Sequence, residues 1–241
     1  MSYLVNPYMV LGSACTYQSG TSYTGWTFTG DYAISSGTIQ ANIDTGYSNN
    51  GSSAYYDIGT ANISETAWIM RWIWELETIT QSGGSPAVVG VGLYSDYPSA
   101  GDDSSLGGDW DPTQQLAVIF ASAEGGQRYF QTCTGNDSTN FYGTTTRSNL
   151  VQDQSFTDTY YMQIQRWDNS GTDTLSYSYT DQSDWSSLTT CNITDTDYMP
   201  DSLRYLKAEA WQYGNGGLGG SGLTSKISDF KFNNDTSDPC E

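Results

Sequence analysis

Short runs of alternating apolar and polar residues recur along this chain. In the longest, Trp68–Ile79, every even position from Trp68 to Leu76 is apolar, whereas the odd positions mix isoleucine with arginine and glutamate. Successive side chains of a strand point to opposite faces of a sheet, so this pattern predicts a long strand with one buried face. The other predicted strands are Thr24–Thr29, Ala33–Ile39, Ala54–Ile58, Val88–Tyr94, Gln115–Ala121, Arg128–Cys133, Tyr160–Trp167, Thr174–Thr180, Arg204–Trp211 and Thr224–Phe232.

Clusters of glycine, serine, asparagine and aspartate separate these runs, as expected for turns between strands. Tyr160–Trp167 and Thr174–Thr180 flank the segment DNSGTD, which predicts a β-hairpin. The chain shows no long helical period, no repeat and no linker between two compositions. We therefore predict one all-β domain, a two-sheet antiparallel β-sandwich of the jelly-roll type at 24–233, with an N-terminal arm or first strand at 1–23 and a C-terminal tail at 234–241.

Charge narrows the range of functions. The chain has 27 acidic and 8 basic residues, a formal net charge of −19. Nucleic acids and anionic membrane surfaces are poor partners for such a protein, because binding to both depends on lysine and arginine. The sequence contains no histidine, which excludes Ser-His-Asp and Cys-His catalysis and histidine-bound zinc. It also has no apolar run long enough to span a membrane.

The cysteines and glycosylation sequons bear on location. The four cysteines contain no Cys-x-x-Cys pair, which argues against zinc ribbons and redox motifs. Of the three possible pairings we favour Cys15–Cys240 with Cys133–Cys191, and free buried thiols remain the alternative. N-x-Ser/Thr sequons suggest a glycoprotein and an exterior location. They lie at Asn50, Asn62, Asn136, Asn192 and Asn234.

Several predicted strands pair an apolar face with a face of amides, charges and aromatic rings. Aromatic rings stack on the CH faces of sugars, and amides and carboxylates bond their hydroxyls, so this composition suits sugar recognition. An ordinary solvated sandwich face has a similar composition, and both interpretations stay open. The candidate ligand-binding residues are Gln163, Gln165, Trp167, Tyr205, Glu209 and Trp211.

The order of segments resembles the concanavalin A-like lectin/glucanase superfamily, including laminin-G-like domains. WIMRWIWELETIT is followed by AVVGVGLYSDY, LAVIFASAEGGQRYF, YYMQIQRWDNSGTDTLSYSYT and finally SKISDFKF. The resemblance covers about residues 24–233 and is one of pattern and order. It implies two antiparallel sheets, one of them concave, with the first and last strands adjacent. Adjacent termini would agree with a Cys15–Cys240 disulfide.

Glucanases of this superfamily carry a Glu-x-Asp-x-(x)-Glu strand motif, which raises the alternative of a β-glycan hydrolase. Glu75 and Glu77 lie on one strand face, about 6.5–7 Å apart along the strand, and Glu209 is a third candidate. However, glutamate stands where the motif has aspartate, and Ile79 and Thr80 stand where its second glutamate belongs. We therefore expect a protein without catalytic activity.

One loop suggests a metal. Ala100–Pro112 reads AGDDSSLGGDWDP and offers carboxylates on a pliable backbone, as Ca²⁺ prefers, although a polar loop without metal is the alternative. The candidate ligands are Asp102, Asp103, Asp109 and Asp111. Together these observations predict an extracellular or virion-surface structural or adhesion protein. Its expected partners are carbohydrate or neighbouring protein subunits, including other copies of the chain in a homo-oligomer.

Overall fold

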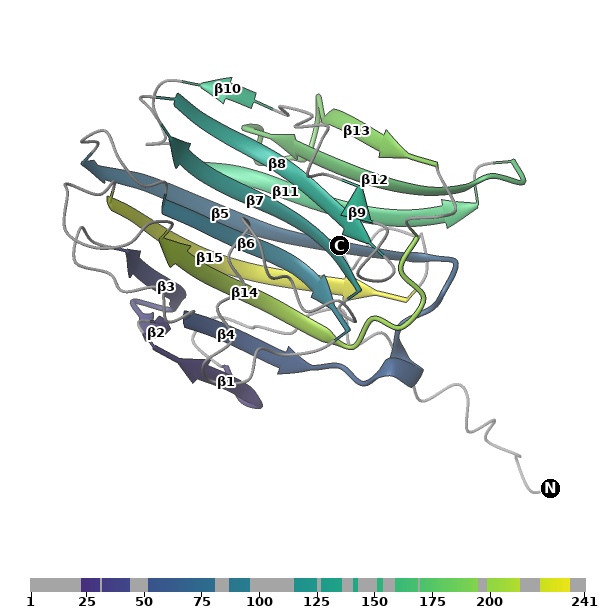
Figure 1. Ribbon diagram of the computed structural model, residues 1–241, viewed down its shortest axis with the longest axis horizontal. Helices are drawn as coiled ribbons and strands as arrows, with labels where there is room; N and C mark the ends of the chain where they lie inside the picture. Colours follow the sequence, from purple (N-terminus) through teal and green to yellow (C-terminus); the bar gives the residue numbers. More distant parts are fainter. Residues whose placement is uncertain are drawn as a thin grey trace.

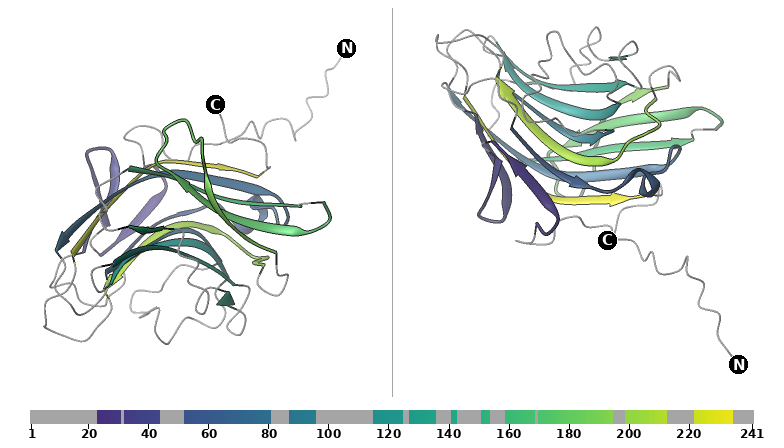
Figure 2. Two further views of the ribbon diagram at one scale, coloured as in Figure 1. Left: turned by 90° about the horizontal axis from the view of Figure 1, so that it is seen from above. Right: turned by 60° about the horizontal axis from the view of Figure 1, so that its bottom comes forward.

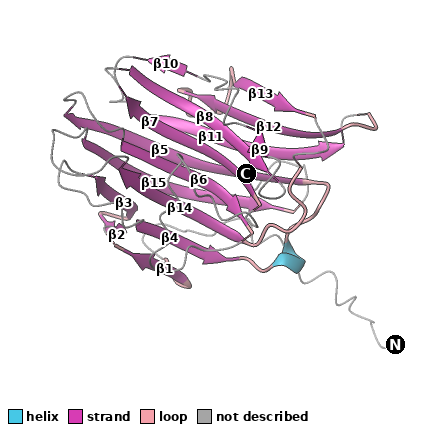
Figure 3. Ribbon diagram, viewed as in Figure 1, coloured by secondary structure: helices cyan, strands magenta, loops and turns pink. Residues whose placement is uncertain are grey.

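Two antiparallel β-sheets packed face to face form the fold in the computed structural model (Figure 1). The described residues are 23–30, 32–43, 52–80, 87–95, 115–124, 127–135, 141–142, 151–153, 159–168, 170–194, 199–212 and 222–234. Within these ranges nearly all regular structure is strand, and the short 3-10 helix η2 (Thr60–Asn62) precedes β5 (Figure 3). The predicted all-β sandwich is confirmed.

The eight-stranded sheet has the order β1-β4-β14-β6-β7-β8-β10, with β9 also paired to β8. Its strands are β1 (Trp26–Thr29), β4 (Ser52–Asp57), β14 (Tyr205–Gln212), β6 (Ala87–Tyr94), β7 (Leu116–Glu124), β8 (Gln127–Gly135), β10 (Val151–Asp153) and β9 (Phe141–Tyr142). This sheet is curved, and its concave side faces away from the other sheet (Figure 2).

The seven-stranded sheet lies over the convex side of the eight-stranded sheet and has the order β13-β12-β11-β5-β15-β3-β2 (Figure 2). Its strands are β13 (Thr189–Ile193), β12 (Asp173–Thr180), β11 (Thr159–Asp168), β5 (Trp68–Thr80), β15 (Gly222–Asn233), β3 (Thr38–Ile43) and β2 (Tyr32–Ser35). The predicted hairpin is the pair β11–β12, which is in register from Tyr161–Thr180 to Asp168–Asp173. Both sheets thus combine strands from distant parts of the chain.

Every predicted strand overlaps an observed one, but Ala33–Ile39 is two strands. Ser36 and Gly37 have φ angles of 50° and 79° and form the tight turn between β2 and β3. Left-handed backbone of this kind suits glycine and cannot continue a strand. The residues Thr38–Ile43 therefore fold back to pair with both β2 and β15.

The core lies between the sheets and is rich in aromatic rings. The even positions of β5 from Trp68 to Leu76 are all buried in it, as the alternation predicts. Trp74 of the seven-stranded sheet meets Phe130 of the eight-stranded sheet with ring centroids 5.8 Å apart. Such ring pairs contribute about 0.5–1.5 kcal/mol beyond their buried area. These contacts fix how one sheet sits on the other.

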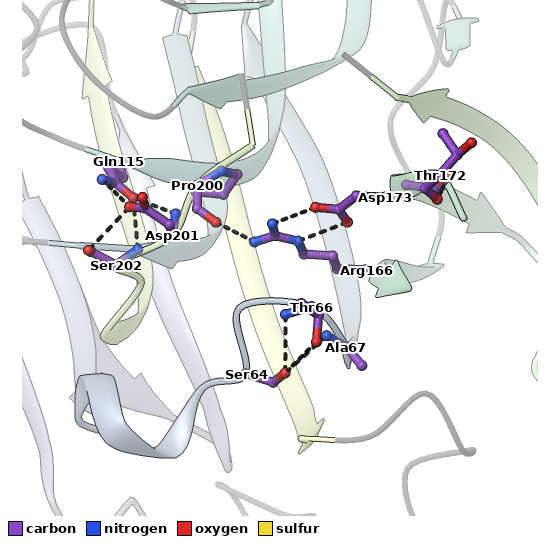
Figure 4. A network of polar contacts seen from close by, with 11 residues as sticks. Ser64, Thr66, Ala67, Gln115, Arg166, Thr172, Asp173, Pro200, Asp201 and Ser202 are labelled. Carbon is purple, nitrogen blue, oxygen red and sulfur yellow. Dashed lines mark hydrogen bonds and ion pairs between the residues drawn. The ribbon is translucent and has the colours of Figure 1, made fainter. Parts of the chain in front are cut away.

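A polar network holds the segment 199–204, which leads into β14 (Figure 4). The buried Arg166 makes two hydrogen bonds to the carboxylate of Asp173 and one to the carbonyl of Pro200. The Gln115 side chain bonds Asp201 through both its amide nitrogen and its carbonyl oxygen. The network therefore ties the start of β14 to strands of both sheets.

Arg204 and Asp57 form a half-exposed ion pair where β4 ends and β14 begins, with nitrogen–oxygen distances of 2.9 and 2.7 Å. The hydrogen bond from Arg204 lowers the pKa of the Asp57 carboxyl below its usual range. A carboxyl group whose pKa is lower in the folded than in the unfolded protein stabilises the fold at pH values above its unfolded-state pKa. This contribution is lost as pH falls through the folded-state pKa. At so exposed a site it amounts to at most about 1 kcal/mol.

Candidate ligand-binding face

The six predicted ligand-binding residues divide between the two sheets. Gln163, Gln165 and Trp167 lie on β11, with their side chains on the outer face of the seven-stranded sheet, opposite the core residues of that strand. Tyr205 and Glu209 lie on the concave outer face of the eight-stranded sheet, where both are buried. Trp211 follows on β14, opposite Val88. The two groups lie on opposite sides of the sandwich and cannot contact one small ligand together.

On the concave face, Glu209 belongs to a buried charged cluster. Its carboxylate lies 2.6 Å from Nζ of Lys207 and accepts a 2.7 Å hydrogen bond from the hydroxyl of Tyr94. The ammonium group also lies 4.2 Å from the centroid of the Tyr94 ring. The Lys207 and Glu209 side chains are only 1% and 7% exposed, so they satisfy one another rather than facing solvent. The sequence pattern placed Lys207 on this face but did not single out its partner Tyr94.

Two glycines on β6 make room for this cluster. In the sheet register Gly90 is the neighbour of Glu209, and Gly92 is the neighbour of Lys207. A Cβ atom at Gly90 would lie 2.4 Å from the ring of Phe120, and one at Gly92 would lie 2.2 Å from a main-chain oxygen of β7. Any larger residue would therefore displace the ring or the strand that packs beside the ion pair.

The three candidate catalytic carboxylates do not come together. Glu75 and Glu77 lie on the outer face of the seven-stranded sheet, where Lys226 of β15 is 4.0 Å from Glu75 and 3.2 Å from Glu77. Glu209 lies on the opposite side of the sandwich. Arg71, on the same strand as the glutamates, bonds Gln163, because the register places β11 beside it.

The predicted Cys133–Cys191 disulfide is wrong. Cys191 is a free thiol on β13 of the seven-stranded sheet, packed against the core, whereas Cys133 lies on β8 of the other sheet. Cys15 and Cys240 lie outside the described residues, as do Asp102, Asp103, Asp109 and Asp111. Among the residues that are described, no three histidine, cysteine or acidic side chains come together as a metal site.

The β11 residues form an ordered row on the convex side of the sandwich. We use the name β11 row for Tyr161, Gln163, Gln165 and Trp167, which share the outer face of β11. Nε of Arg71 donates a 2.8 Å hydrogen bond to Oε1 of Gln163, whose Nε2 lies 3.3 Å from Oε1 of Gln165. These two bonds fix the orientation of the Gln163 amide and orient the carbonyl of Gln165 toward it.

Trp185 covers the Tyr161 end of the row. Its ring meets Tyr161 edge-on at 5.5 Å, and the Arg71 guanidinium lies 4.7 Å from its centroid. Trp185 and Ser187 both have positive φ angles, 61° and 56°. For a bulky residue this backbone is strained, and such strain gathers where a side chain must be held in place for function. The sequence alone could not show that the loop carrying Trp185 folds onto β11.

Hydrogen bonds hold the loop that carries Trp185. The Thr180 hydroxyl donates to the carbonyl of Ser186 at 2.7 Å, and the Ser186 amide donates to the Asp184 carboxylate at 3.0 Å. Hydrogen bonds from Ser186 lower the pKa of the Asp184 carboxyl below its usual range. The carboxylate stays charged at neutral pH, and its support for the loop is lost only as pH falls through that lowered pKa.

The other end of the row consists of Trp167 and Gln165. Trp167 is half-buried, and within the described ranges its ring makes no hydrogen bond or aromatic contact. Gln165 is also half-buried, and its Nε2 donates no hydrogen bond to any described residue. An indole and a free amide thus stand side by side on one strand face, and this combination can stack on a sugar ring and bond its hydroxyls.

The fold can be compared with known structures. No protein-family model and no curated sequence matches this chain. Among solved structures, the Emp47p carbohydrate recognition domain matches with a TM-score of 0.57 and 13% identity over 88% of this chain and 89% of that one. A legume lectin-like domain from Entamoeba histolytica matches with a TM-score of 0.57 and 14% identity over 90% and 95%.

A third match is the CBM2 module of the evolved Dit protein of Lactobacillus casei BL23 phage J-1, with a TM-score of 0.52 and 12% identity over 87% of this chain and 89% of that one. At sequence identities this low, the structural similarity shows a common fold and nothing more. The resemblance inferred from the order of segments is confirmed at that level: this chain has the concanavalin A-like lectin fold.

Proposed function

We propose that this protein is a non-catalytic carbohydrate-binding domain that acts outside the cell or on a virion surface. The observation that carries the proposal is the β11 row, in which half-buried rings flank amides whose orientation is already fixed. Groups held in place before binding lose little conformational entropy when the ligand arrives, so this arrangement favours affinity.

Two further observations support the proposal. The fold is shared with a carbohydrate recognition domain and with a carbohydrate-binding module of a phage protein. The acidic candidates for catalysis are divided between two faces, and Glu75 and Glu77 both pair with Lys226. Among the described residues no helix has the length and apolar character to cross a membrane. Assembly with neighbouring subunits stays a prediction.

Binding tests the proposal directly. We expect the labelled protein to bind a subset of glycans on an array, and Trp167→Ala to weaken that binding. A tryptophan that is a hot spot of an interface typically contributes about 2 kcal/mol or more, which is about thirtyfold in Kd. Glu77→Gln, an exposed change on the same sheet outside the row, serves as the matched control and should leave Kd unchanged.

The same glycans test the absence of catalysis. After prolonged incubation with the protein, chromatography should recover each oligosaccharide intact. Binding to no glycan, or equal binding by wild type and Trp167→Ala, would contradict the proposed site. Cleavage by the wild type that disappears in Glu75→Gln would instead favour the β-glycan hydrolase.

A further inference from the structure

The β11 row is longer than one sugar. Tyr161 and Trp167 are six residues apart on one strand, a span of about 20 Å at ~3.3 Å per residue. The two ends of this span are aromatic and the middle is polar. Trp167 stands at one end, Tyr161 with Trp185 at the other, and the two glutamines lie between them. A single pyranose ring can contact one end of the row but not both.

The small residues beside the row leave the long side chains standing above the sheet. Thr174, Ser176 and Ser178 of β12 are the register neighbours of Trp167, Gln165 and Gln163. All three are buried, so they offer an even floor rather than a wall. A ligand that follows β11 can therefore meet Tyr161, Gln165 and Trp167, the half-buried members of the row, whereas Gln163 is buried beneath them.

The charges around the row indicate an uncharged ligand. Arg71 lies beside the row, but its guanidinium is held by Gln163 and Trp185. The exposed Asp184 is the chain neighbour of Trp185, and the whole chain carries a formal charge of −19. This field repels polyanions such as uronate or sulfated chains.

We propose that the β11 row binds the interior of an extended, uncharged polysaccharide chain laid along β11. This inference rests on the proposed function and adds the class of glycan. Rings at both ends stack on sugars several positions apart, and the free amide of Gln165 bonds hydroxyls between them. The affinity must then grow with the length of the oligosaccharide until both ends of the row are filled.

Isothermal titration with cello-, manno- and laminari-oligosaccharides, from disaccharide to hexasaccharide, tests this. In the series that binds, the hexasaccharide should bind at least about tenfold more tightly than the disaccharide, the equivalent of one further stacking or hydrogen-bonding contact. Either Trp167→Ala or Trp185→Ala should remove this gain, because each empties one end of the row. Hexagalacturonate should bind at least about tenfold more weakly than the best neutral hexasaccharide at low salt.

The outcomes separate the two proposals. Equal affinities for disaccharide and hexasaccharide, or tighter binding of hexagalacturonate, would overturn the extended neutral chain while leaving carbohydrate binding in place. Length-dependent binding that both tryptophan variants retain would place the glycan elsewhere on the protein and also overturn the inference. Binding of no oligosaccharide at any length would overturn the proposed function as well.

Discussion

Replacing Lys207 by methionine is expected to lower the free energy of unfolding by about 3–5 kcal/mol, because it leaves the Glu209 carboxylate buried without its counter-charge. The two side chains are almost wholly buried and 2.6 Å apart. Among the described residues, Tyr94 alone would remain as a hydrogen-bond donor to the carboxylate. Urea unfolding of wild type and variant, followed by tryptophan fluorescence, measures the difference.

A double replacement tests whether the loss of stability comes from the unpaired charge or from altered packing. With Lys207→Met and Glu209→Leu together neither charge of this pair is left, and we expect most of the lost stability to return. Lys226→Met is the matched control, because Lys226 pairs with Glu75 and Glu77 at a partly exposed site, where an ion pair contributes only about 0–1 kcal/mol. Additive losses in the double variant would show that the two charges do not compensate each other.

Trp74→Ala is expected to lower the free energy of unfolding by about 3–5 kcal/mol, the usual range for removing a buried tryptophan from a core. Trp74 is fully buried, and its ring packs between Trp72 on its own strand and Phe130 of the other sheet. Its indole nitrogen donates a 2.7 Å hydrogen bond to the buried hydroxyl of Ser225. The loss combines a cavity between the sheets with an unsatisfied hydroxyl.

The neighbouring Trp72 provides a control of the same size. It is also fully buried, but its indole nitrogen has no hydrogen-bond partner among the described residues. Trp74→Phe should therefore destabilise the protein by about 1–2 kcal/mol more than Trp72→Phe, because only the former leaves a donor or acceptor unpaired. Equal losses measured by urea unfolding would mean that the bond to Ser225 contributes nothing.

The strand pattern was predictable because it depends on local chemistry. The five successive even positions of β5 from Trp68 to Leu76 are all apolar, and the burial of that face follows directly from the alternation. The turn at Ser36–Gly37 was missed because Ala33–Ile39 was predicted as one strand, although its Ser-Ser-Gly cluster favours a turn. Short edge strands such as β13 carry too few buried residues to stand out from the sequence.

The candidate site was predictable only in part. Alternation shows that Gln165 and Glu209 each lie on a polar strand face, but it does not show which sheet a strand joins. The pairing of β11 with β5, and of β14 with β4 and β6, decides that these two residues lie on opposite sides of the sandwich. Long-range pairing also brings Trp185 and Arg71 together from separate segments of the chain. The failure of the Cys133–Cys191 prediction has the same cause.

The most direct test of the central claim is a crystal structure of this protein with the neutral hexasaccharide that it binds most tightly. We predict density for the sugar along β11, with rings stacked on Trp167 at one end and against Trp185 at the other. Gln165 should donate to a hydroxyl between them. Density on the concave face of the eight-stranded sheet, with the β11 row unoccupied, would contradict the account.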